Sequence, residues 1–139
     1  MIRQGEAVFV DSGAWIALAL SRDPLHSRAR EQWEALRAAG ARLHTSVPVV
    51  METFTFLDRN ANRDVALTWK DAIAKLGMLR ILACELHDLQ VSWDYFRRSD
   101  LHKLSAVDAT SFAIMKRARL RLAYTFDHHF AVVGFRMVG

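Results

Sequence analysis

The sequence is poor in the residues that mark disulfide-rich, zinc-binding or low-complexity proteins. It holds one cysteine, two prolines and six glycines in 139 residues. The single cysteine, Cys84, excludes an internal disulfide framework and a Cys-rich zinc site, and it favours a reducing compartment. No Gly-rich phosphate loop is present, which argues against the common nucleotide-binding folds.

Long apolar runs are missing as well. The longest, residues 13–20, ends at a Ser-Arg-Asp sequence and is far shorter than the ~20 apolar residues that cross a membrane. The apolar run near the N-terminus, residues 7–10, is too short for the core of a signal peptide. We therefore expect a cytoplasmic protein without a membrane segment.

The residues that are present fit one folded domain. Apolar residues make up 52% of the chain and charged residues 24%, which argues against disorder. A length of 139 residues matches one typical domain, so we expect a single domain over residues 1–139. Lysine and arginine number 19 against 15 acids, and the net charge of +4 gives a mild attraction for anions such as nucleic acids.

Short apolar strands alternate with amphipathic helices along the chain. Strands are predicted over residues 7–10, 42–45, 78–82, 122–125 and 134–138. Caps and terminators predict helices over 14–20, from Pro24 to Gly40, from Ser46 past Leu57, and over 64–76, 85–98 and 105–119. This alternation predicts an α/β fold with a mostly parallel sheet that helices cover on both faces.

Four acids occupy positions where such a sheet binds ligands, beyond the carboxyl ends of its strands. Asp11 and Asp127 each follow a predicted strand, Asp108 lies in the first turn of a helix, and Glu52 lies one turn into another. Helix capping alone explains the three aspartates, Asp108 through a capping box with Ser105. It does not explain Glu52, which is embedded in the apolar string VVMETFTFL, where a charge needs a partner or a metal.

Four strings carry a resemblance to a known family: VFVDSGAWIALAL, TSVPVVMETFTFL, LSAVDATSFAIMKRARL and AYTFDHHFAVVGF. In order and spacing they resemble the motifs of PIN-domain ribonucleases, most closely the toxin subunits of VapBC-type toxin–antitoxin pairs. The resemblance extends from about Ala7 to the end of the chain. It implies a PIN fold with a five-stranded, mostly parallel sheet and endonuclease activity on RNA.

The resemblance also implies a site, a cofactor and partners. The acids at its motif positions are Asp11, Glu52, Asp108 and Asp127. They would hold Mg²⁺ or Mn²⁺, the hard ions that an all-oxygen ligand set prefers to zinc. Ser12 and Thr125 take positions where the family often has a small hydroxyl. A small antitoxin protein and a second copy of the chain, in a homodimer, are the expected partners beside the RNA substrate.

Setting the four acids aside leaves 19 basic residues against 11 acidic ones. The basic residues form two clusters: Arg97, Arg98 and Lys103 before the third motif, and Lys116, Arg117, Arg119 and Arg121 after it. Either cluster would suit RNA phosphates, but basic residues at helix C-termini also favour the helix dipole. His128 and His129 are adjacent, and no zinc-binding spacing accompanies them.

Three other functions fit the α/β pattern. A haloacid-dehalogenase-type phosphatase would need a second aspartate two residues after Asp11, where the chain has Gly13. A receiver-type signalling domain would need a phosphorylated aspartate after the middle strand and a lysine after the last. The chain offers Glu85 and no lysine after Asp127. A non-catalytic PIN-like module that binds RNA or a protein remains open.

Overall fold

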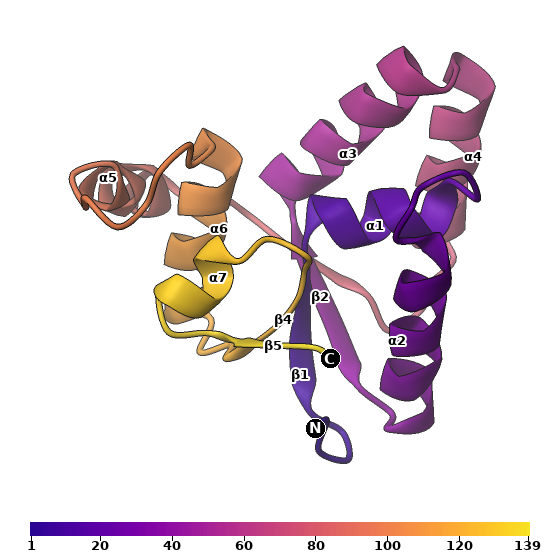
Figure 1. The fold of residues 1–139 in the computed structure, drawn as a ribbon, viewed down its shortest axis with the longest axis horizontal. Coiled ribbons are helices and arrows are strands. Elements are labelled where there is room, and N and C mark those ends of the chain that lie inside the picture. The colour runs from indigo at the N-terminus through magenta and orange to yellow at the C-terminus, as the bar shows by residue number, and fades with distance from the viewer.

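In a computed structural model that describes residues 1–139, five parallel strands form one sheet (Figure 1). The strands are β1 (Ala7–Val10), β2 (Arg42–Ser46), β3 (Arg80–Leu82), β4 (Leu122–Tyr124) and β5 (Arg136–Met137). The helices are α1 (Ser12–Ala19), α2 (His26–Ala38), α3 (Val47–Asn60), α4 (Arg63–Ala74), α5 (Leu86–Tyr95), α6 (Ala106–Arg117) and α7 (His129–Val132). The predicted α/β class with a parallel sheet is confirmed.

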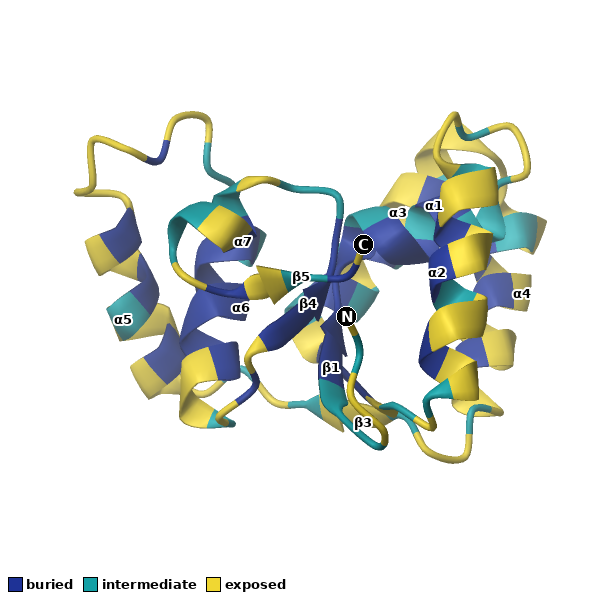
Figure 2. Cartoon of the chain, turned by 60° about the horizontal axis from the view of Figure 1, so that its bottom comes forward, coloured by how far each residue is buried: buried dark blue, intermediate teal, exposed yellow.

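The strand order is β3-β2-β1-β4-β5, and every neighbouring pair is parallel. The chain builds outward from β1 to β3 and then returns to add β4 and β5 on the other side of β1. Because parallel crossovers are right-handed, this reversal puts the later helices on the opposite face. Figure 2 shows α1 to α4 on one side of the sheet and α5 to α7 on the other.

The central strands are buried on both faces. Val8, Phe9 and Val10 are inaccessible to solvent, and all of β4 is buried. Such burial explains why these strands are continuous apolar runs without polar alternation. The Tyr124 hydroxyl at the end of β4 donates a hydrogen bond to the carbonyl oxygen of Ala29 in α2, which ties the sheet to that helix.

Side-chain caps fix where two helices of the predicted site begin. The Ser46 hydroxyl accepts the N–H of Val49 at 3.3 Å and starts α3. The Ser105 hydroxyl accepts the N–H of Asp108 at 3.0 Å, which is the serine half of the predicted capping box. Each cap fixes the first residue of its helix, so Asp108 lies in the first turn of α6 and Glu52 within the first two turns of α3.

Some predicted boundaries were wrong. Helix α2 begins at His26, later than Pro24, because the Asp23 side chain accepts the N–H of Leu25 at 2.8 Å in a turn. Helix α6 ends at Arg117, and the predicted last residue, Arg119, has a left-handed φ of 59°. None of the helices combines the length and apolar character that crossing a membrane requires.

Candidate metal centre

The reversal of chain order between β1 and β4 brings Asp11 and Thr125 together. Asp11 follows β1 and donates its N–H to the carbonyl oxygen of Tyr124 at 3.0 Å. The Thr125 hydroxyl donates to Asp11 Oδ2 at 2.9 Å. Asp11 is only 3% exposed. In open α/β sheets ligands bind at this kind of switch point, so the position that the sequence assigns to Asp11 is the one the fold favours.

Thr125 also holds Asp127. The Asp127 N–H donates to Thr125 Oγ1 at 3.0 Å, so one hydroxyl bridges two acids. Asp127 Oδ1 accepts the N–H of His129, the first residue of α7, at 2.9 Å. Asp108 approaches from α6, and its carboxyl lies within 4.8 Å of ligand atoms of Asp127 and His129.

Glu52 reaches the site from α3. The Ser12 hydroxyl, in the first turn of α1, donates to Glu52 Oε1 at 2.6 Å. This bond spans two helices on the same face of the sheet and fixes the carboxylate next to the end of β1. The charge of Glu52 acts on Asp11, as does that of Asp127. The structure therefore brings all four sequence-predicted acids together.

The pKa of Asp11 is raised to about 6. Burial is the main cause, and the charges of Glu52 and Asp127 add to it, whereas the hydrogen bond from Thr125 opposes it. At the sheet edge, the charged form of the Asp11 carboxyl is therefore less favourable than it would be in water.

Asp108 and Asp127 differ in their preference for a proton. Burial raises the pKa of Asp108 to about 9, and a hydrogen bond to Asp127 and the charge of Asp11 add to the effect. Burial alone would raise the pKa of Asp127 too, but the hydrogen bond from Asp108 and the contacts with His129 hold it below its usual range. In the absence of a cation, Asp108 keeps the proton and Asp127 carries the charge.

One buried oxygen of the site has no hydrogen-bond donor within the protein. Asp11 Oδ1 is buried and accepts no hydrogen bond. A buried acceptor without a donor is costly, and a cation next to it removes that cost. Carboxylate oxygens are the ligands of Mg²⁺ and Mn²⁺, so the donor set and the unpartnered oxygen fit such an ion.

His129 belongs to the same cluster, and sequence reasoning missed it. Its Nε2 lies 2.7 Å from the carbonyl oxygen of His102, and because a carbonyl only accepts, Nε2 carries the hydrogen. Its Nδ1 is buried and lies 2.9 Å from Asp127 Oδ1, yet the direction is wrong for a hydrogen bond. The available signal was the Asp-x-His spacing after β4, which places the imidazole beside Asp127.

Each of the two basic clusters has arginines held in ion pairs within the protein. Arg117 donates to Asp88 at 2.9 Å and to the carbonyl oxygen of Ala83 at 2.9 Å, so it ties α6 to the start of α5. Asp88 is 1% exposed, which makes this a structural ion pair. Arg97 and Arg98 lie in the loop after α5 and pair with acids close to them in sequence.

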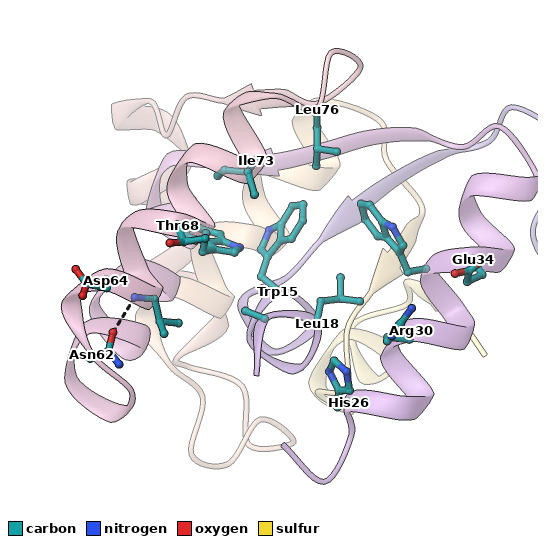
Figure 3. A pocket seen from close by; sticks show the side chains of 15 residues that line it. Trp15, Leu18, His26, Arg30, Glu34, Asn62, Asp64, Thr68, Ile73 and Leu76 are labelled. Carbon is teal, nitrogen blue, oxygen red and sulfur yellow. Dashed lines mark hydrogen bonds between the residues drawn. The ribbon is translucent and has the colours of Figure 1, made fainter. Parts of the chain in front are cut away.

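A cavity of about 840 Å³ opens between α1, α2 and α4, and none of the four acids of the site lines it (Figure 3). Trp15 lies at its base, with its ring 6.0 Å from that of Trp33 and 6.1 Å from that of Trp69. The wall from α4 begins at Asn62, whose side chain accepts the N–H of Val65 at 2.8 Å. Polar side chains also line the cavity: His26, Arg30, Glu34 and Asp64.

Comparison with known proteins identifies the family of this chain. The family model of the PIN domain matches residues 8–136. The chain is 32% identical over 128 residues to the 23S rRNA-specific endonuclease VapC20 of Mycobacterium tuberculosis, which covers 92% of this chain and 95% of the relative.

Solved structures agree. The crystal structure of Mycobacterium tuberculosis VapC20, described as a sarcin–ricin loop cleaving toxin, matches with a TM-score of 0.82 and 31% identity over 92% of this chain and 95% of its own. FitAcB from Neisseria gonorrhoeae matches with a TM-score of 0.69 at 14% identity over 95% and 96%, and DNA-bound VapBC from Salmonella typhimurium with 0.66 at 15% identity over 95% and 96%. These two show the fold alone.

Proposed function

Because the chain belongs to the PIN-domain family, we propose that it is a metal-dependent endoribonuclease and the toxin of a toxin–antitoxin pair. The observation that carries this proposal is the convergence of four carboxylates at the switch point of the sheet, with Asp11 Oδ1 buried and unpartnered. Structural caps do not need that convergence. All four acids at the motif positions are present, which favours a catalytic protein over a non-catalytic module.

The residues that would hold Mg²⁺ or Mn²⁺ are the four acids of the site: Asp11, Glu52, Asp108 and Asp127. When bound, the ion supplies charge neutralisation at the scissile phosphate and lowers the pKa of the attacking water. Thr125 and Ser12 position three of these acids through hydrogen bonds of 2.6 to 3.0 Å. Asp108 releases its proton when the site is loaded, so we expect metal affinity to rise with pH.

Glu52 is the group that we assign to accept a proton from the attacking water. The Ser12 hydroxyl occupies Glu52 Oε1 and orients the carboxylate, which leaves its other oxygen for this contact. Hydrolysis forms a bond between the water oxygen and phosphorus and breaks the bond between phosphorus and the 3′ oxygen. The departing 3′ oxygen takes up a proton from water, which balances the proton that Glu52 accepts.

We include His129 in the ligand set. Its Nε2–H is fixed by the His102 carbonyl, which is the usual support for a histidine that binds metal through the other nitrogen. The separation of 2.9 Å between Nδ1 and Asp127 Oδ1 suits two neighbouring donors of one ion, which lie about 3 Å apart when each bond is about 2.1 Å. A nitrogen ligand shifts the preference toward Mn²⁺ over Mg²⁺.

The experiment that tests the proposal is cleavage of RNA by the purified protein. The first substrate is a 23S rRNA fragment with its sarcin–ricin loop, because the 32% identical relative is named for cleavage of 23S rRNA. We expect cleavage with Mg²⁺ or Mn²⁺, and loss of cleavage with EDTA and in Asp11→Asn and Asp108→Asn. The exposed Asp71→Asn serves as the control with the same change of charge.

Retained cleavage in both site variants would refute the carboxylate mechanism. If wild type binds the RNA and leaves it intact in every metal tested, the chain is instead a non-catalytic RNA-binding module. The control variant must cleave as wild type does, because it changes one surface charge and no residue of the site.

We further propose that the cavity between α1, α2 and α4 receives an apolar segment of the antitoxin (Figure 3). Leu18, Ile73 and Leu76 lie with the tryptophans around it, so it offers apolar side chains from three helices to one occupant. Its rim carries both Arg30 and Glu34, which suits a partner with charges of both signs next to its apolar residues.

The expected homodimer stays a prediction, and α5 supplies a surface for it. Leu86, Leu89, Trp93 and Phe96 recur at helical spacing and are 37 to 69% exposed. An apolar stripe of this kind on a soluble chain marks an interface. We propose that a second copy covers it, and that Trp93→Glu gives a monomer in light scattering. A monomeric wild type would refute this arrangement.

A further inference from the structure

A second concave site lies at the opposite edge of the sheet from the acids. It has a volume of about 560 Å³ and is formed by the segments before β1, β4 and β5 and by the end of α6. We call it the basic pocket. Its charged lining residues are Arg3, Glu6, Lys116, Arg119, Arg121 and Arg136. Five cations and one carboxylate thus line one pocket, and their net charge of +4 equals that of the whole chain.

Most of these cations have no counter-charge within the protein. The Glu6 carboxylate pairs with Arg136 at 3.0 Å and accepts a hydrogen bond from the backbone N–H of Arg3. The side chains of Arg3, Lys116, Arg119 and Arg121 are exposed and form no ion pair. In contrast, Arg117 of the same basic run is bound to Asp88.

The helix dipole accounts for only part of this charge. Lys116 lies in the last turn of α6, where a cation is favoured. Arg119 lies beyond the helix end, and its left-handed φ of 59° turns the chain out of the helix into the pocket wall. Arg121 precedes β4. Like charges held close together without partners are favourable when an anion occupies the space between them.

We propose that the basic pocket binds the phosphate backbone of the RNA substrate at a distance from the cleavage point. The inference rests on the proposed ribonuclease function. Asp108 and Lys116 are eight residues apart on α6, a distance of about 12 Å at 1.5 Å per residue. The two sites therefore lie at opposite ends of one helix, and only an RNA longer than a few nucleotides, or a folded one, reaches both (Figure 1).

The test is RNA affinity of Arg119→Gln/Arg121→Gln, measured by fluorescence anisotropy with EDTA present to stop cleavage. The RNA is a folded rRNA fragment. Arg22→Gln/Arg59→Gln removes the same charge from exposed positions outside the pocket. We expect the pocket variant to bind the folded RNA about tenfold more weakly, with a salt slope lower by roughly 1.4 to 1.8, and we expect the control variant to bind as wild type does.

Equal losses in the pocket variant and the control would overturn the proposal, because they would show a general charge effect. Unchanged affinity for the folded RNA in the pocket variant would overturn it too, as would loss of antitoxin binding alone. Cleavage is scored separately in metal. A protein that cleaves normally but shows no selective loss refutes the basic pocket alone, whereas absence of all cleavage refutes the proposed function.

Discussion

Replacing Asp11 by asparagine should stabilise the metal-free protein while it destroys the site. The pKa of Asp11 is about 6 in the folded chain against 3.8 for an ordinary aspartate. The folded state thus holds the proton more tightly than the unfolded chain, and raising the pH from about 4 to 6 favours unfolding. Above pH 6 the penalty is complete, and at about 1.4 kcal/mol per unit it amounts to about 3 kcal/mol.

Asparagine removes this penalty and keeps an oxygen that accepts the hydrogen bond from Thr125. At pH 8 with EDTA we expect Asp11→Asn to melt above wild type, by up to about 10 °C for a domain of this size. At pH 4 the difference should vanish. Saturating Mn²⁺ should raise the Tm of wild type and leave the variant unchanged, since an ion that binds only the folded site stabilises it by mass action.

Circular dichroism melts of both proteins from pH 4 to 8 measure this difference directly, and the shared pH dependence of other groups cancels. Asp71→Asn is again the control and should match wild type at every pH. A variant that is less stable than wild type in EDTA at pH 8 would refute the idea that burial and neighbouring charges make the ionised Asp11 carboxylate unfavourable. Equal stabilisation of both proteins by Mn²⁺ would place the ion elsewhere.

Three further predictions concern other contacts. Arg117→Met leaves the buried Asp88 carboxylate without its partner and should cost about 3 kcal/mol in urea unfolding at pH 7, whereas Arg117→Met in an Asp88→Asn background should cost less. Burial raises the pKa of Asp88, but hydrogen bonds and the charge of Arg117 hold it below its usual range. The loss of stability in Arg117→Met should therefore shrink as the pH falls toward 3, because the unpaired carboxyl takes up a proton. Thr68→Arg, an exposed position in the apolar cavity, should abolish antitoxin inhibition and keep RNA cleavage, and retained inhibition would refute that docking site. Ser12→Ala removes the bond to Glu52 and should lower kcat about 10- to 100-fold with KM unchanged, and an unchanged kcat would contradict the role of Glu52.

The sequence predicted the parts of the molecule that depend on local patterns. Central strands such as β1 are short apolar runs, and Asp11 follows one of them directly. Four separate strings with acids at matching positions were enough to assign the family and to expect the acids at one edge. The caps at Ser46 and Ser105 were readable because each involves residues three apart.

Contacts between distant segments could not be read in this way. The bond from Ser12 to Glu52 spans 40 residues, and that from Arg117 to Asp88 spans 29. In the sequence, His129 was one of two adjacent histidines without a zinc-binding spacing, and nothing there indicated its contact with the carbonyl oxygen of His102. The two basic clusters were likewise equivalent in sequence. Folding distinguishes them, because Arg97 and Arg98 of one cluster pair with nearby acids, whereas Lys116, Arg119 and Arg121 of the other line a pocket.

Anomalous diffraction from crystals grown with MnCl₂ tests the metal centre most directly. We predict a manganese peak within bonding distance of Asp11, Asp108 and Asp127 in wild type, with His129 Nδ1 as a further ligand, and no such peak in Asp108→Asn. A protein that cleaves RNA under these conditions but shows no manganese at the four acids would contradict the assignment of this site.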